Sequence, residues 1–132
     1  VSNLKNTIDL ISKCDFMNLG IALDALHFFR SNSSIKLLKK FSEKYINYFQ
    51  ICDAKKLSKV PTTEQLIFEA TKNRLSPGKG DINLKEIIEV LPKDIPFAIE
   101  IPQTEKYSEK ETSKKLERIV NEVKNYLKSL EI

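Results

Sequence analysis

The chain alternates short apolar segments with longer amphipathic ones. Three segments, at 19–23, 46–52 and 95–101, are apolar at most positions and too short for helices. Such segments are typical of parallel strands covered by helices. In the segments between and around them, apolar residues at helical spacing predict helices. We expect these helices at 4–11, 35–41, 62–70, 84–90 and 108–130.

A helix therefore precedes the first predicted strand and a helix follows each strand, which indicates an α/β fold with parallel strands. Three strands cannot close a barrel, and an open sheet of three strands has exposed edges. The pattern leaves two alternatives: a small α/β sandwich, or the end of a barrel whose five earlier strands precede this chain.

The composition is that of an ordinary globular protein, with 41% hydrophobic and 30% charged residues in 132 positions, enough for one domain. The net charge of +4 would suit a nucleic-acid partner. However, arginine, which is favoured for bidentate contacts to phosphates and bases, occurs only at Arg30, Arg74 and Arg118. Most lysines alternate with glutamates on predicted helix faces, so we expect a solvated surface and no nucleic-acid partner.

Neither a membrane segment nor a secretion signal is recognisable. No apolar run reaches the roughly 20 residues of a transmembrane helix. Cys14 and Cys52 lie far apart and lack the spacing of a zinc or redox motif. We expect both to be buried free thiols in a reducing cytosol, and the protein to be cytoplasmic.

A polar residue stands at or near the end of each predicted strand. Asp24 ends the first strand, Gln50 lies late in the second with Asp53 just past it, and Glu100 lies near the end of the third. Functional groups collect at the carboxyl ends of parallel strands, which are only about 4.8 Å apart. Asp24, Gln50 and Glu100 can therefore share one metal ion. Alternatively, each caps a helix or begins a loop, and for Asp24 the two interpretations are equally well supported.

Two further features lie near these strand ends. His27, the single histidine, follows Asp24 by three residues, so both can face one pocket, although a lone histidine beside aromatic residues is more often structural. The loop 73–81 contains Arg74 and two of the three glycines. It can present backbone amides and a guanidinium to an anionic or polyhydroxyl substrate, or simply form a turn.

Four segments, taken in order, resemble the signatures of the sugar phosphate isomerases/epimerases, the xylose isomerase-like barrels. They are Leu-Asp-Ala-Leu-His-Phe-Phe-Arg at 23–30, Tyr-Phe-Gln-Ile-Cys-Asp-Ala at 48–54, Asn-Arg-Leu-Ser-Pro-Gly-Lys-Gly-Asp-Ile at 73–82 and Ala-Ile-Glu-Ile-Pro at 98–102. Their order and spacing match too, so the resemblance covers essentially the whole chain. It implies that residues 1–132 form a single partial domain, the C-terminal part of a (β/α)₈ TIM barrel with strands six to eight. The N-terminal strands would lie outside this chain.

The resemblance also implies a site. Asp24 and Glu100 would be metal ligands, and Glu100 would in addition be the catalytic acid/base. His27 and Arg74 would contact substrate oxygens. Gln50 occupies the position where many members place a ligand histidine, and its carbonyl suits Mg²⁺ or Mn²⁺ better than Zn²⁺. The first ligand glutamate of the family would lie on an earlier strand, so we expect this chain alone to be inactive.

The implied activity is that of a sugar (phosphate) isomerase/epimerase, using metal-assisted proton transfer next to a carbonyl through an enediolate. Alternatives on the same barrel are a lyase that dehydrates a keto-polyol such as an inosose, an apurinic-site endonuclease, which the single histidine disfavours, and a non-catalytic relative. The implied partners are a small carbohydrate or keto-polyol and the N-terminal half of the barrel. A homo-oligomer is compatible with this interpretation, and neither a nucleic acid nor a membrane is implied.

Overall fold

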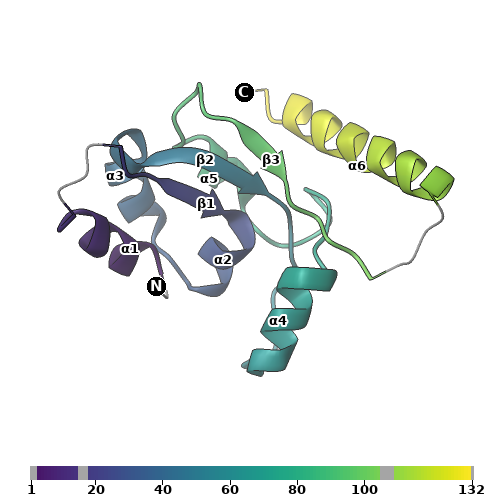
Figure 1. Ribbon diagram of the computed structural model, residues 1–132, viewed down its shortest axis with the longest axis horizontal. Helices are drawn as coiled ribbons and strands as arrows, with labels where there is room; N and C mark the ends of the chain where they lie inside the picture. The colour runs from purple at the N-terminus through teal and green to yellow at the C-terminus, as the bar shows by residue number, and fades with distance from the viewer. Residues whose placement is uncertain (1–2, 15–17, 105–108, 132) are drawn as a thin grey trace. The chain divides into compact units, whose positions relative to one another are not determined.

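The computed structural model describes residues 3–14, 18–104 and 109–131. Its three strands form one parallel sheet in the order β1-β2-β3 (Figure 1). The strands are β1 (Ile21–Asp24), β2 (Ile46–Ile51) and β3 (Phe97–Ile99). The helices are α1 (Leu4–Ile11), α2 (Ala25–Arg30), α3 (Ile35–Tyr45), α4 (Thr63–Lys72), α5 (Leu84–Ile88) and α6 (Glu109–Ser129).

The chain divides into two compact units. The first comprises Val1–Ile51 and Asn83–Ala98, and the second comprises Cys52–Ile82 and Ile99–Ile132. The first unit therefore contains α1, β1, α2, α3, β2, α5 and most of β3, while the second contains α4 and α6.

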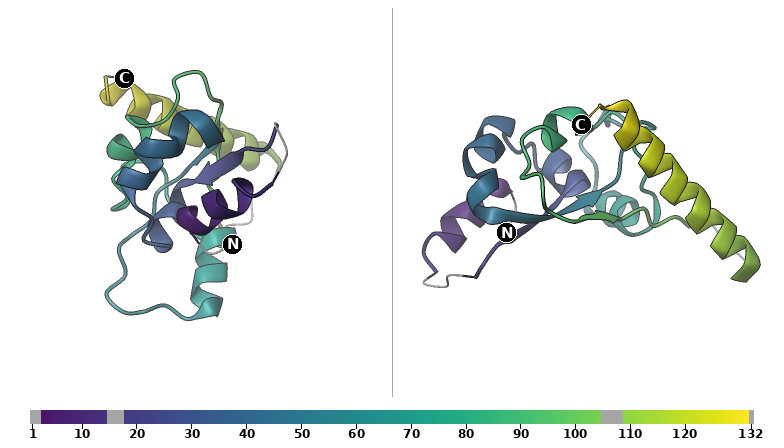
Figure 2. Two further views of the ribbon diagram at one scale, coloured as in Figure 1. Left: turned by 90° about the vertical axis from the view of Figure 1, so that its left-hand side faces the viewer. Right: turned by 90° about the horizontal axis from the view of Figure 1, so that it is seen from above.

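In the first unit, α3 and α5 lie on the same side of the β1–β2 pair (Figure 2, right). The Ser34 hydroxyl caps α3 by accepting a hydrogen bond from the Leu37 nitrogen at 3.4 Å. Leu38 of α3 and Phe49 of β2 are both fully buried. Burial of one such side chain stabilises a fold by roughly 1.5–3 kcal/mol, so both residues contribute to the core of this unit.

A bulge in β2 sets the register between β1 and β2. Asn47 has no partner in β1, and this extra residue shifts the rest of β2 by one position, which brings Gln50 opposite Asp24. Without the bulge, Phe49 would take that place. Gly20, just before β1, makes room for the bulge, because the Asn47 side chain lies where a Cβ of Gly20 would be.

In the second unit, α4 begins with a capping box. The Gln65 nitrogen donates to the Thr62 hydroxyl at 3.3 Å, and the Thr62 nitrogen donates to the Gln65 side-chain oxygen at 2.9 Å. Residue 62 was the predicted helix start, and the box confirms it. α6 buries Ile119 and Val123.

The order and type of the predicted elements are confirmed, with two differences. The short helix α2 was not predicted. β3 is shorter than the predicted segment 95–101. Pro96, directly before it, has no N–H for the ladder. Of the two cysteines, Cys52 is buried as expected, whereas Cys14 is only half-buried. In the described parts of the chain, no helix is both long and apolar enough to span a bilayer.

Candidate functional site

Asp24 and Gln50 are direct partners at the carboxyl ends of neighbouring strands. The preceding pair in the register, Leu23 and Phe49, is buried in the core. Side chains alternate along a strand, so Asp24 and Gln50 face the opposite side of the sheet. Both line a pocket of about 280 Å³, and His27 of α2 lines it with them. The structure thus brings together three of the predicted site residues.

Asp24 also has a structural task. It is the N-cap of α2, and one of its carboxylate oxygens accepts a hydrogen bond from the His27 nitrogen at 3.1 Å. Of the two interpretations offered by the sequence, helix capping is therefore observed. The cap holds the carboxylate in one orientation at the strand end and places His27, whose side chain is exposed, one turn away.

The pocket itself follows the edge of the sheet. Its lining takes in all four residues of β1, including Ile21 and Leu23, whose side chains are buried. In the described chain, β1 is paired on one side only, with β2. The pocket is thus a hollow along this edge, and Leu4 and Thr7 of α1 line it as well.

Two predicted site residues belong to the second unit. Glu100 follows β3 directly and is half-buried. Arg74 is 5% exposed, and contacts of its guanidinium hold it in place. Its Nε donates to the Ala70 carbonyl at 2.8 Å, and its Nη1 lies 3.5 Å from the Cys52 sulfur.

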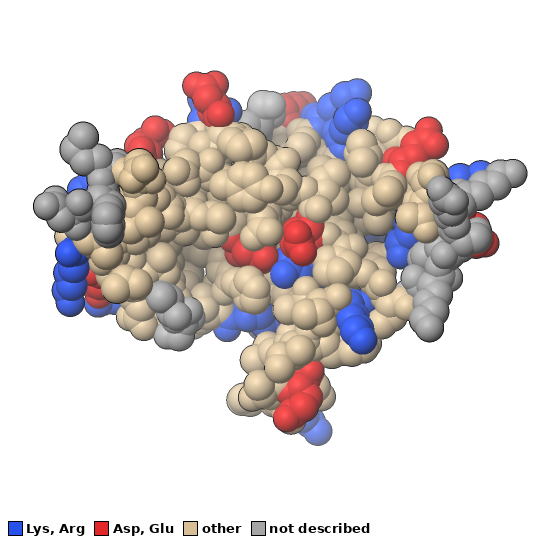
Figure 3. Space-filling view, in the orientation of Figure 1, with Lys and Arg blue, Asp and Glu red and all other residues tan. Residues whose placement is uncertain are grey.

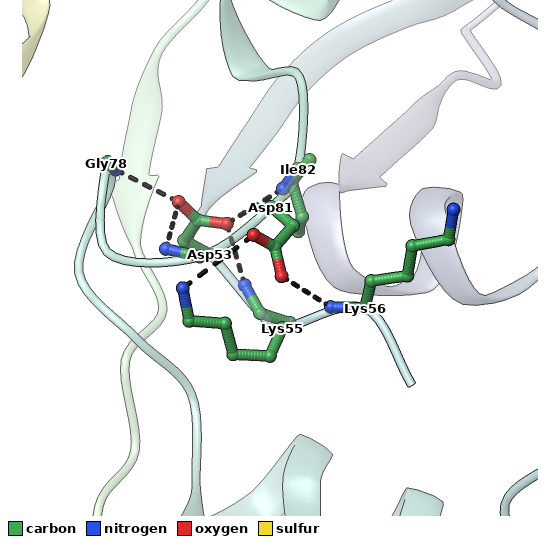
Figure 4. A network of polar contacts seen from close by, with 8 residues as sticks. Asp53, Lys55, Lys56, Gly78, Asp81 and Ile82 are labelled. Carbon is green, nitrogen blue, oxygen red and sulfur yellow. Dashed lines mark hydrogen bonds and ion pairs between the residues drawn. The ribbon is translucent and has the colours of Figure 1, made fainter. Parts of the chain in front are cut away.

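Asp53 organises the loop that the sequence singled out, although no role was predicted for it. The Asp53 carboxylate is 1% exposed and accepts four backbone hydrogen bonds (Figure 4). The donors are the nitrogens of Ala54 at 2.8 Å, Gly78 at 3.0 Å, Gly80 at 2.9 Å and Ile82 at 3.1 Å. Two amides of the loop 73–81, those of Gly78 and Gly80, thus bind a carboxylate of the chain itself. For these two amides, the turn is the interpretation that the structure supports.

Tyr126 of α6 lies next to this loop. A Cβ on Gly78 would lie 3.0 Å from the tyrosine ring. Partial burial raises the pKa of the Tyr126 phenol above its ordinary value of 10.0, and the negative charge of Asp53 raises it further.

The donor set fits a divalent cation in part. Asp24 and Gln50 offer a carboxylate and an amide oxygen at adjacent strand ends, the ligand type of hard cations. Within the described residues, however, no group of three or more His, Cys, Asp or Glu side chains is close enough to hold a metal ion. A complete coordination shell therefore needs ligands beyond this pair.

The family described as the xylose isomerase-like TIM barrel matches residues 1–129. The chain belongs to this family. Its three parallel strands are accordingly part of a TIM barrel, as the sequence predicted. The family contains sugar isomerases and related enzymes that bind small sugar substrates. No curated protein matches the chain.

Solved structures of similar fold support the assignment. The crystal structure of the IolI protein with a bound zinc atom has a TM-score of 0.69 and 22% identity, covering 98% of this chain and 44% of that one. A xylose isomerase domain protein from Alicyclobacillus acidocaldarius subsp. acidocaldarius has a TM-score of 0.58 and 19% identity, covering 92% and 43%. A fusion of a xylose isomerase-like TIM barrel with 4-hydroxyphenylpyruvate dioxygenase has a TM-score of 0.67 and 18% identity, covering 82% and 17%. The chain spans less than half of each.

Proposed function

We propose that this member of the xylose isomerase-like family is part of a sugar isomerase or epimerase that transfers a proton next to a carbonyl. The observation that carries the proposal is the register pair of Asp24 and Gln50, whose oxygens share one pocket with His27. The hollow along β1 is, on this proposal, the position of a preceding barrel strand.

In the complete barrel, Asp24, Gln50 and Glu100 would hold a divalent cation, together with a ligand from an earlier strand. The oxygen donors of this chain favour Mg²⁺ or Mn²⁺ over Zn²⁺. When bound, such a cation polarises the carbonyl and hydroxyl oxygens of the substrate. The similar IolI structure contains zinc, which supports a divalent cation in this fold.

Glu100 is the proposed acid/base. Phe97 packs edge-on against Phe49, with ring centroids 5.1 Å apart, so Ala98 faces the other side of the sheet. By the same alternation, a residue two positions after Ala98 is expected on that side of the strand, which supports a catalytic role for Glu100. Glu100 would take the proton from the carbon next to the carbonyl, while His27 and Arg74 orient the substrate oxygens.

The test is a panel of aldoses and ketoses, with and without phosphate, supplied to the complete natural protein with Mg²⁺ or Mn²⁺. Exchange of the carbon-bound hydrogen with deuterated solvent, followed by NMR, reports the proton transfer directly. Glu100→Gln should abolish both exchange and turnover while the thermal unfolding midpoint is retained. Glu89→Gln, which changes an exposed glutamate of the first unit, should leave both rates unchanged.

Retained exchange in Glu100→Gln would remove Glu100 from the catalytic role. Loss of water from a keto-polyol, instead of isomerisation, would identify a lyase of the same fold. A protein that exchanges no carbon-bound hydrogen in any substrate of the panel would contradict the proposal as a whole.

A further inference from the structure

α4 is a helix whose apolar residues are left exposed. It has ten residues, and none of them is buried by the parts of the chain that the structure describes. Leu66, Ile67 and Phe68, in its middle, are all exposed. A helix of this length is only marginally stable in water by itself, because helices in proteins are stabilised mainly by packing of an apolar face. The capping box satisfies backbone groups of the first turn only. We therefore expect a further partner for α4.

The exposed apolar surface of α4 continues into a groove. A pocket of about 560 Å³ lies between α4 and the loop that precedes it. Its apolar lining consists of Leu57, Val60 and Pro61 from the loop and Phe68 from the helix. Val60 is 94% exposed. Apolar side chains that gather on a surface in this way mark an interaction site, whereas single exposed ones do not.

The exposed residues of α4 follow helical spacing. Four of them stand at positions i, i+3, i+4 and i+7 and so form one stripe along the helix, namely Glu64, Ile67, Phe68 and Thr71. The stripe begins with an acidic residue and is apolar in its middle, and Lys72 follows directly on its end. The two ends of the stripe therefore differ in charge, while its centre is apolar.

This pattern is complementary to itself when two copies of α4 run antiparallel. A two-fold axis beside Ile67 and Phe68 would bring the two apolar centres together. It would also place Glu64 of each copy near Lys72 of the other, so that two ion pairs form. In a parallel pair, glutamate would face glutamate and lysine would face lysine, and like charges repel. The charges thus favour the antiparallel arrangement.

We propose that α4 and the groove beside it form a dimerisation surface for a second copy of this protein. In the dimer, Ile67 and Phe68 of each copy pack against α4 of the other, and Leu57 and Val60 extend the contact at its edge. A helix of ten residues is only about 15 Å long, so the surface is smaller than the roughly 1,200–2,000 Å² of stable complexes. The dimer is therefore weak, with a dissociation constant on the order of micromolar or higher. The proposal does not depend on the reaction proposed above.

Sedimentation velocity of the complete natural protein, from about 1 μM to about 1 mM, measures the dimer directly, and a monomer–dimer equilibrium is expected. Ile67→Glu should raise the dissociation constant at least about tenfold, because a carboxylate would have to be buried at the apolar centre. Leu116→Glu is the matched control. Leu116 of α6 is 59% exposed and Ile67 is 57% exposed, and the control should change the constant less than about twofold.

An exchange of charges tests the antiparallel arrangement. Glu64→Lys would bring two lysines together at each end of the dimer, and Lys72→Glu would bring two glutamates together. Each variant alone should dimerise at least about tenfold more weakly than the natural protein, because two ion pairs are replaced by two repulsive pairs. When the two variants are mixed, every lysine faces a glutamate, so a heterodimer as tight as the natural dimer is expected. Lys124→Glu, which changes an exposed lysine of α6, should alter the constant less than about twofold.

A natural protein that stays monomeric up to about 1 mM would overturn the proposal. So would an Ile67→Glu variant that dimerises as tightly as the natural protein, or charge variants that do not associate when mixed. Thermal unfolding identifies the other possible occupant. In a monomeric protein, a larger loss of thermal stability in Ile67→Glu than in Leu116→Glu would show that another part of the same protein covers α4, and the dimer would be contradicted.

Discussion

The backbone nitrogen of Gly80 lies 2.9 Å from a carboxylate oxygen of Asp53, 27 positions earlier in the chain. This hydrogen bond is one of four that converge on the same buried side chain. A single carboxylate thus fixes the loop that begins at Arg74, the residue proposed to contact substrate from this unit. On the face seen in Figure 3, acidic and basic side chains of the described residues are interspersed.

Asp53→Asn should destabilise the complete protein by about 3 kcal/mol or more, since each buried hydrogen bond to a charged group is worth about 1.5–3 kcal/mol. An asparagine would turn its NH₂ group toward two backbone donors that now bind a carboxylate oxygen. Urea unfolding measures the loss. Asp81→Asn is the control: Asp81 is exposed, accepts a hydrogen bond from the Lys56 backbone nitrogen at 2.8 Å and lies 3.7 Å from the Lys55 ammonium nitrogen. An asparagine oxygen can still accept the Lys56 bond and the ion pair is exposed, so the cost should stay below about 1 kcal/mol. Equal effects of the two changes would contradict a dominant role of Asp53.

Gly80→Ala should cost about 3 kcal/mol, because overpacking of a fixed site costs about 1–3 kcal/mol and a hydrogen bond is lost in addition. The added Cβ would collide with Asp53 and with the Ala54 backbone, neither of which can move without breaking the network. Gly20→Ala is the matched control. The three atoms nearest its Cβ would all belong to the side chain of Asn47, which is exposed and can rotate away, so the free energy of unfolding should fall by less than about 1 kcal/mol. Thermal unfolding of both variants tests whether Gly80→Ala loses more stability than Gly20→Ala.

The raised pKa of Tyr126 predicts a loss of stability in alkaline solution. The folded state disfavours the phenolate, whereas the unfolded chain ionises near the ordinary pKa of 10.0. Stability is therefore constant with respect to this group below pH 10, and falls as the pH rises from 10 toward the folded pKa. Tyr126→Phe should flatten this part of the stability profile. Asp53→Asn removes the negative charge and should lower the phenol pKa, which an ultraviolet titration of tyrosinate measures against Tyr126→Phe. An unchanged phenol pKa would contradict the contribution of Asp53.

The helices and strands could largely be predicted from the sequence. A strand that is buried on both faces has a short, continuous apolar run, and a helix that is buried on one face has apolar residues at helical spacing. α2 was not predicted, because a helix of six residues has too few turns for apolar residues to recur at helical spacing. β3 was predicted too long, because the apolar run extends beyond the three residues that form the strand, and Pro96 before them cannot donate to the ladder.

The residues of the site that lie at strand ends could be predicted from the sequence. The features that depend on contacts between distant parts of the chain could not. Asp24 and Gln50 lie at or near the ends of apolar runs. Their placement at the same edge of the sheet could therefore be predicted from the α/β pattern. The bulge at Asn47 that aligns them depends on the match between two strands and has no signal of its own. Asp53 and the loop glycines are each visible in the sequence, but their hydrogen bonds join positions 25 and 27 residues apart, which periodicity does not report.

Gln50→His should change the metal preference of the complete protein. If Gln50 is a ligand, replacing its amide oxygen by an imidazole favours Zn²⁺ over Mg²⁺. The shift in the affinity ratio should be roughly tenfold or more, since even changes behind the ligands alter metal affinity 10–100-fold. Gln50→Leu, which has no donor, should weaken both metals. Calorimetric titration with each metal measures the ratio, and circular dichroism confirms that the half-buried position tolerates the change. If Gln50→Leu binds each metal as tightly as the natural protein does, Gln50 is not a metal ligand. The proposed metal site at the Asp24–Gln50 pair would then be contradicted.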